Sequence, residues 1–128
     1  MSSTPVNNDR VTTRRTTANL AAYPYRLVKA SGAADTALCG AGELPIGATG
    51  VDAGASTTDA HWIEVHEGDE MVVTAGAAIT APALVMSDAN GKVVAATANK
   101  FAIGQVKNDV AADGDLCVVI KGIGWYEA

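Results

Sequence analysis

Alternating apolar and polar residues are clearest in the second half of the chain, where they predict a series of short β-strands. These segments are rich in valine, isoleucine and other strand-forming residues, and they cover residues 62–66, 70–75, 84–87, 92–96, 101–106 and 116–123. Turn-forming residues separate them at fairly regular intervals. This spacing is typical of an all-β sandwich or barrel.

Two turns between these strands have a specific sequence signal. Asp88-Ala89-Asn90-Gly91 lies between two strand-forming runs, and Asn-Gly favours a tight hairpin because both residues tolerate a positive φ. Ala112-Asp113-Gly114-Asp115 leads into the last predicted strand. The second half of the chain therefore predicts antiparallel pairing between neighbouring strands.

The first 22 residues have a different pattern. They are rich in serine, threonine and asparagine and contain few apolar side chains, so they offer little surface to bury. They carry a net charge of +2, whereas residues 23–128 carry −7. We predict a flexible N-terminal arm over 1–22, which is disordered alone or ordered on a neighbouring molecule, and a single β-rich domain over 23–128.

Between the arm and the regular strands the pattern is mixed. Residues 25–30 suit a first strand, and residues 35–39 suit one helical turn. Residues 40–60 contain many glycines and Pro45, which favour a long loop or irregular crossover. Long loops in small domains often contact a partner.

Composition narrows the class further. The 128 residues suit one domain, and 25 alanines, 13 glycines and one phenylalanine predict a thin core. An acidic body is poorly suited to nucleic-acid binding. With no apolar leader and no span-length apolar run, we expect a soluble chain made in a reducing cytoplasm, with Cys39 and Cys117 as buried apolar residues.

Candidate metal sites fail on geometry. His61 and His66 are five residues apart on a predicted strand, so alternation sends them to opposite faces. An acidic cluster at Glu64, Glu67, Asp69 and Glu70 surrounds a tight turn rather than a cleft. The run from Asp88 to Gly91 lacks the distal glutamate of a calcium loop. We expect no metal and no other cofactor.

Candidate catalytic motifs are also incomplete. Gly40-Ala41-Gly42 begins like a dinucleotide-binding loop, but Pro45 stands in place of the third glycine and no βαβ unit surrounds it. Neither cysteine has a neighbouring histidine, and no serine lies in a nucleophile-elbow motif. We therefore expect no catalytic residues and no enzymatic activity.

Residues 71–86 and 87–96, together with Ile103-Gly104-Gln105 and residues 114–120, resemble the phage capsid cement family, the head decoration proteins. The shared features are an alanine-rich stretch ending in Leu-Val, an acidic and glycine-containing hairpin, an Ile-Gly strand and a final apolar strand. The resemblance covers roughly residues 23–123 and is best after residue 62.

This resemblance implies a small β-sandwich or barrel-like (β-tulip-like) domain on the outer surface of an icosahedral head. Such proteins commonly form trimers, bind after the shell expands and bridge neighbouring major capsid proteins. The implied partners are the major capsid protein and other copies of this chain, with no nucleic acid and no membrane. Candidate contact residues lie in the arm and near both ends of the domain: Arg10, Arg14, Arg15, Tyr23, Tyr25, Trp125 and Tyr126.

Two alternatives remain open at this point. A glycan- or host-surface-binding module of a virion would need an aromatic platform, for which Trp62, Trp125 and the tyrosines are available. A lipoyl-type carrier would present a modified lysine at a hairpin tip. Here Asn90-Gly91 occupies the tip and Lys92 follows it, which disfavours the carrier.

Overall fold

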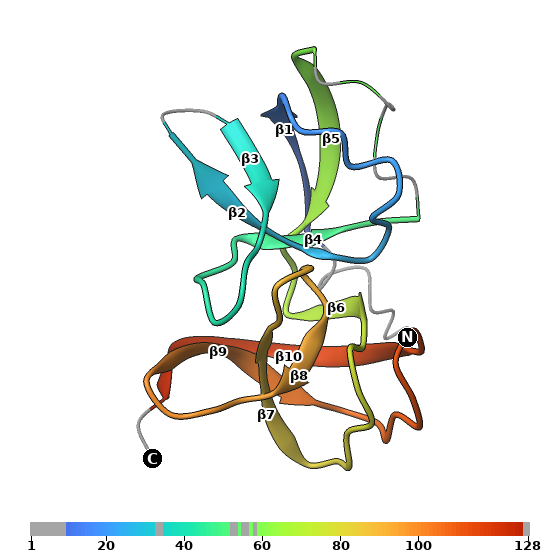
Figure 1. Cartoon of the computed structure of the whole chain (residues 1–128), viewed down its shortest axis with the longest axis vertical. Coiled ribbons are helices and arrows are strands. Elements are labelled where there is room, and N and C mark those ends of the chain that lie inside the picture. Colours follow the sequence, from blue (N-terminus) through green and yellow to red (C-terminus); the bar gives the residue numbers. More distant parts are fainter. Residues whose placement is uncertain (1–9, 33–34, 52–53, 55–56, 58, 127–128) are drawn as a thin grey trace, which may run out of the picture.

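The computed structural model describes residues 10–32, 35–51, 54, 57 and 59–126. The described chain consists of β-strands, turns and loops, so the predicted mainly-β fold is confirmed. Its strands form two lobes that lie one above the other in Figure 1. The first lobe holds β1 (Val11–Thr16), β2 (Leu27–Ser31), β3 (Asp35–Leu38), β4 (Gly47–Thr49) and β5 (His61–His66). The second holds β6 (Glu70–Thr74), β7 (Ala83–Ser87), β8 (Val93–Ala95), β9 (Lys100–Val106) and β10 (Leu116–Tyr126).

The first lobe is a closed barrel with the strand order β1-β3-β2-β4-β5. β1 closes it, because it pairs antiparallel with β5 from Val11↔His66 to Thr16↔His61 and parallel with β3 at Arg15↔Asp35. Closure leaves this sheet without a free edge strand.

A small core fills this barrel. It is formed by Leu20, Val28, Ile63 and Val65, with Tyr23 and other partly buried side chains packed against it. The predicted alternation along β5 is confirmed, because Ile63 and Val65 are buried whereas Trp62 and Glu64 are exposed.

The second lobe is a sheet with the order β6-β10-β9-β7-β8. Each of its strands overlaps one predicted from the sequence, and β7 and β8 form the expected hairpin, with Gly91 at φ +74°. β10 runs past its predicted end at residue 123, to Tyr126. Ala75, directly after β6, forms a parallel bridge with Val93 of β8, so the two outer strands approach each other at one end.

A larger core lies in the second lobe and draws side chains from both lobes. Leu27, Cys39 and Ala48 of the first lobe are fully buried there with second-lobe residues such as Val73 and Val85. Because adjacent strand residues point to opposite faces, Leu27 enters this larger core while its neighbour Val28 enters the barrel core. β2 therefore contributes to both cores.

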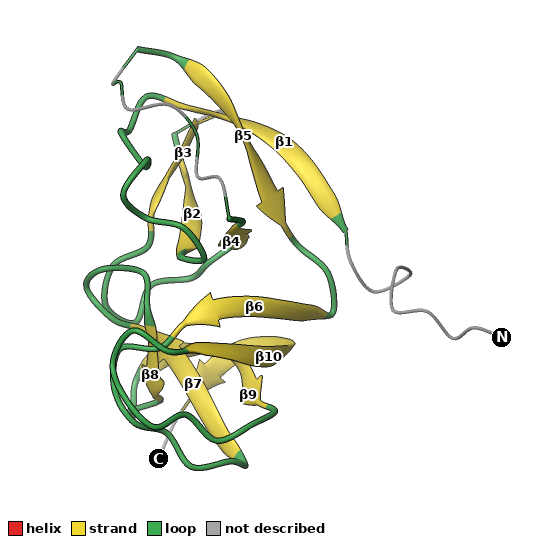
Figure 2. Cartoon of the chain, turned by 90° about the vertical axis from the view of Figure 1, so that its right-hand side faces the viewer, coloured by secondary structure: helices red, strands yellow, loops and turns green. Residues whose placement is uncertain are grey.

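Backbone hydrogen bonds also join the lobes. The Leu27 amide donates to the Gly91 carbonyl at 2.8 Å, and the Thr74 amide donates to the Tyr25 carbonyl at 2.8 Å. Figure 2 shows β6 lying across the top of the second lobe, facing β4. The lobes thus meet through ordered backbone as well as apolar side chains.

The structure corrects three expectations for the first half of the chain. Within the predicted arm, residues 11–16 form β1 and Leu20 is 2 % exposed in the barrel core, while residues 1–9 lie outside the described part. The helical turn expected over 35–39 is instead β3, because Asp35 to Leu38 pair with β2. The long loop expected over 40–60 contains β4, which pairs with both β2 and β5.

Candidate partner-binding surface

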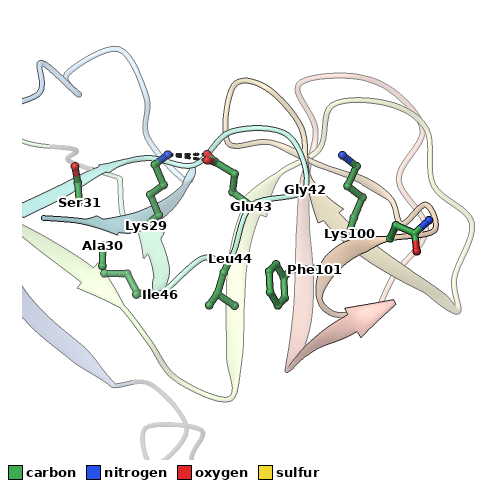
Figure 3. Close-up of a pocket in the computed structure, with 10 residues that line it drawn as sticks. Lys29, Ala30, Ser31, Gly42, Glu43, Leu44, Ile46, Lys100 and Phe101 are labelled. Carbon is green, nitrogen blue, oxygen red and sulfur yellow. Dashed lines mark hydrogen bonds and ion pairs between the residues drawn. The ribbon is translucent and has the colours of Figure 1, made fainter. Parts of the chain in front are cut away.

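An open groove of about 660 Å³ lies between the two lobes. Figure 3 shows the side chains that line it, which come from β2, from the segment following β3 and from the start of β9. The lining residues are Lys29, Ala30, Ser31, Gly42, Glu43, Leu44, Ile46, Asn99, Lys100 and Phe101.

Residues 39–46 form one wall of the groove and are fixed to the second lobe by Gly42. The Gly42 amide donates to the Ser87 carbonyl at 2.9 Å, and the Phe101 amide donates to the Gly42 carbonyl at 3.2 Å. Gly42 has φ +66°, a backbone conformation that residues with a Cβ rarely adopt, and its Cα faces the side chain of Lys100. The positive φ therefore favours glycine at this position.

Glu43 organises the same segment through charge. Its carboxylate accepts two hydrogen bonds from Nζ of Lys29, at 2.8 and 2.9 Å, and one from the Gly40 amide at 2.6 Å. The Lys29 hydrogen bond, followed by the Gly40 amide, lowers the pKa of Glu43 below its ordinary value. The carboxylate thus stays ionised and links β2 to the groove wall.

The groove has two chemically distinct sides. In Figure 3 the charged ends of Lys29, Glu43 and Lys100 lie along one side, and Leu44 and Phe101 lie next to each other on the other. Leu44 is 49 % exposed although it is a large apolar residue. This arrangement suits a ligand that is itself partly charged and partly apolar.

The three arginines predicted as partner contacts lie on or beside β1. Arg10 is exposed, Arg15 forms an ion pair with Asp35 at 3.2 Å, and Nε of Arg14 donates to Oγ1 of Thr36 at 3.2 Å. Arg14 and Arg15 thus link β1 to β3. A role for these arginines in partner binding stays a prediction.

The two N-terminal tyrosines of the predicted contact set also contact the scaffold, and their role in partner binding stays a prediction. Tyr23 packs against the barrel core, and the Arg26 guanidinium lies over its ring at 5.3 Å. Tyr25 has φ +55°, and its carbonyl accepts the Thr74 amide that joins the lobes. Both side chains are only partly exposed.

Trp125 and Tyr126 belong to β10 rather than to a free tail. Their backbones pair with Phe101 and Lys100, the two residues of β9 that line the groove. The end of β10 therefore runs directly beside the groove, while the side chains of Trp125 and Tyr126 lie outside the described part.

The sequence did not identify Lys29, Glu43, Leu44, Lys100 or Phe101 as site residues. They are far apart in the chain and come together only because residues 39–46 cross from one lobe to the other. The one available signal was the glycine density after residue 39, which marked this segment as a possible contact region.

A second unusual surface is the outer face of the second sheet. Val72 and Val118 are directly paired, and Ile120 pairs with Gln105, which in turn pairs with Leu84. Several large apolar side chains on this face are 40–49 % exposed: Val72, Leu84, Leu116 and Ile120. Exposed apolar patches of this kind mark interaction surfaces.

The first lobe exposes one large aromatic side chain, Trp62, at 67 %. Trp62 lies on β5, and its cross-strand partner on β1 is Arg15. Tryptophan and arginine are both enriched among the residues that dominate binding energies.

The described histidines and cysteines form no reactive or metal-binding group. No set of three or more histidine, cysteine, aspartate or glutamate residues in this part of the chain could hold a metal ion. Cys39 and Cys117 are buried free thiols, as predicted. Burial raises the pKa of both, that of Cys117 to about 11, so both remain protonated and unreactive.

Two further observations bear on the alternatives. Nζ of Lys92 forms an ion pair with Asp113 at 2.9 Å and the side chain is 20 % exposed, which disfavours a modified carrier lysine. Across the described residues, no helix is long and apolar enough to cross a membrane.

The fold resembles a solved phage structure. The chain aligns with the head fiber gp8.5 N base of bacteriophage phi29 at a TM-score of 0.69 and 16 % sequence identity, covering 89 % of this chain and 94 % of that one. At this identity the likeness shows a shared fold. No family model matches the sequence, and no curated protein matches it either.

Proposed function

We propose that this protein is a structural component of a phage head that binds the outer surface of the shell and reinforces the lattice of the major capsid protein. The observation that carries the proposal is the likeness to the phi29 head fiber base over nearly the whole of both chains. The resemblance of residues 71–105 to capsid cement proteins supports the same assignment. The role is structural rather than catalytic.

Self-association as a homotrimer is part of this proposal, and the outer face of the second sheet supports it. The apolar side chains of that face surround one charged pair, in which Nζ of Lys107 lies 2.8 Å from Oε2 of Glu70. Because this pair is neutral, the same face of three copies can meet around a three-fold axis without the repulsion expected from a chain of net charge −5. Burial of Leu116 and Ile120 would stabilise the contact.

Co-sedimentation with undecorated heads of the encoding phage tests the proposal. We expect saturable binding of the purified protein, and electron microscopy of the decorated heads should place the added density outside the shell. Analytical ultracentrifugation of the free protein should give a trimer mass, which Ile120→Ser should lower. Failure of the wild-type protein to bind heads would refute the proposal, and a monomer mass at all concentrations would remove self-association from it.

A second candidate, a glycan-binding module of a virion, is favoured by Trp62 alone. An indole ring that is 67 % exposed on a rigid strand can serve as a platform for a ligand. A glycan array would support this function if the wild-type protein bound one defined glycan and Trp62→Ala did not. Absence of any specific glycan would leave the structural role as the better explanation.

A further inference from the structure

We infer that the groove between the lobes receives a segment of a head protein that presents a carboxylate beside an apolar side chain. This inference rests on the proposed function, because it names the chemistry by which the protein would recognise the head. Lys100 would pair with the carboxylate, and Leu44 and Phe101 would contact the apolar side chain.

The charge argument begins with the lysines of the described chain. Three form ion pairs with carboxylates, Lys29 with Glu43, Lys92 with Asp113 and Lys107 with Glu70, and Lys121 donates to the Glu67 carbonyl. The side chain of Lys100, in contrast, makes no hydrogen bond or ion pair with any described residue, and it is exposed at the groove. It is therefore a cation available to a partner on an otherwise acidic protein.

The apolar argument rests on Leu44 and Phe101, which lie side by side across from the charged groups in Figure 3. Leu44 is 49 % exposed, but its segment is held in place by the Gly42 hydrogen bonds and by the Glu43–Lys29 ion pair. An apolar group that is already ordered in the free protein loses little entropy on binding. The apolar side of the groove is thus preorganised for binding an apolar side chain.

The same features favour a protein segment over an anion or a nucleic acid. The Glu43 carboxylate lies on the charged side of the groove and compensates Lys29, so the net charge of the three ionised groups is only +1. Phosphate binding requires clustered, uncompensated cations. A peptide also offers backbone groups that Ser31 and Asn99, which line the groove, can bind.

Head binding by matched variants tests the inference. Lys100→Glu and Leu44→Ser should each weaken binding to undecorated heads by about tenfold, since one introduces repulsion and the other removes an apolar contact. Lys100→Arg should bind like the wild type because it keeps the charge. Val51→Ser, at an apolar residue that is 76 % exposed and lies outside the groove, is the control for Leu44→Ser.

The outcomes separate the inference from the function on which it rests. If the wild-type protein does not bind heads, the proposed function fails and the inference fails with it. If the wild type binds and both groove variants bind equally well, the proposed function stands and the inference is overturned. Loss of binding in Trp62→Ala but in neither groove variant would likewise overturn it, by assigning the contact to the β1–β5 face.

Both groove substitutions are at exposed or half-exposed side chains, so the variants should fold. Thermal unfolding of each variant checks this directly. The salt dependence of binding provides an independent readout, because wild-type binding should weaken as ionic strength rises, and Lys100→Gln should reduce that dependence. An unchanged salt dependence in Lys100→Gln would contradict a charge contact at this residue.

Discussion

The first lobe closes five strands into a barrel around a small core, whereas the second lobe keeps an open strand order and surrounds a larger core. The difference lies partly in sequence distance. β1 of the first lobe pairs with β5, some fifty residues later, while β7 and β8 of the second lobe pair across one short turn. The first lobe therefore depends on long-range pairing, whose loop-closure entropy must be offset by the rest of the fold.

The comparison also shows that the lobes are not independent. Leu27, Cys39 and Ala48 belong to the first lobe, but their side chains are buried in the larger core. A barrel core of so few side chains contributes little burial by itself. We therefore expect the first lobe to be stable only while it is docked on the second.

The largest expected effect is that of Leu27→Ala. Removal of this fully buried side chain should lower the free energy of unfolding by about 2–5 kcal/mol. Because Leu27 belongs to β2 but packs in the larger core, amide hydrogen exchange should accelerate in both lobes. Ile63→Ala, in the barrel core, should accelerate exchange mainly in the first lobe. Exchange that rises only in the first lobe for both variants would show that the lobes open independently.

Gly91→Ala should have the next largest effect, because it acts where the hairpin meets β2. Gly91 has φ +74°, and a Cβ there would lie 2.8 Å from the Leu27 carbonyl oxygen. Gly114→Ala is the matched control, since Gly114 also has a positive φ, +95°, but open space around it. Urea denaturation should show a loss for Gly91→Ala that exceeds the loss for Gly114→Ala by about 1–3 kcal/mol. Equal losses would mean that the contact between Gly91 and β2 is easily relaxed.

Thr16→Val tests whether β1 is an integral part of the barrel. Oγ1 of the fully buried Thr16 donates to the Thr36 carbonyl at 2.6 Å and accepts from the Ala18 amide at 3.0 Å. Valine has the same shape but leaves both partners unsatisfied, so we expect a loss of about 1–3 kcal/mol in urea denaturation. Thr13→Val, on the exposed face of β1, should change stability by less than about 0.5 kcal/mol. If Thr16→Val left the stability unchanged, β1 would be only loosely attached to the barrel.

Glu43→Gln should have the smallest effect, and the effect should depend on pH. The folded-state pKa of Glu43 is lowered by Lys29 and the Gly40 amide, so its contribution is present above its ordinary pKa and is lost as pH falls through the lowered value. Wild type and variant should therefore differ in urea midpoint at pH 7 and converge at an acidic pH below the lowered pKa of Glu43. A difference that is the same at both pH values would assign the effect to the hydrogen bonds alone.

The second lobe was largely predictable because its signals are local. The Asp88–Gly91 turn and the valine-rich runs around it determine a hairpin without reference to the rest of the chain. The limit of β10 was less predictable, because Gly122 and Gly124 weaken the strand pattern where a register irregularity lies between Lys121 and Gly124. Pairing with β9 extends the strand beyond that point.

The first lobe was less predictable because its strands look polar. β1, Val-Thr-Thr-Arg-Arg-Thr, has few apolar side chains, yet it is ordered by pairing with β5 and by the buried hydroxyl of Thr16. Residues 35–38 were assigned to a helical turn because their pairing partner, β2, is not apparent from local propensity. The groove was hidden for the same reason, since its walls are assembled by contacts between lobes.

The outer strands of the second sheet, β6 and β8, affect how neighbouring copies of the protein can pair with one another. Exposed strand edges are templates for pairing with other chains. Here the edge of β6 is occupied where the Thr74 amide donates to Tyr25, and that of β8 where the Val93 carbonyl accepts the Gly76 amide at 2.8 Å. Under the proposed function, many copies of this protein would lie close together on one particle. Because these edge positions are already hydrogen-bonded within the chain, they are not open to strand pairing with a neighbouring copy.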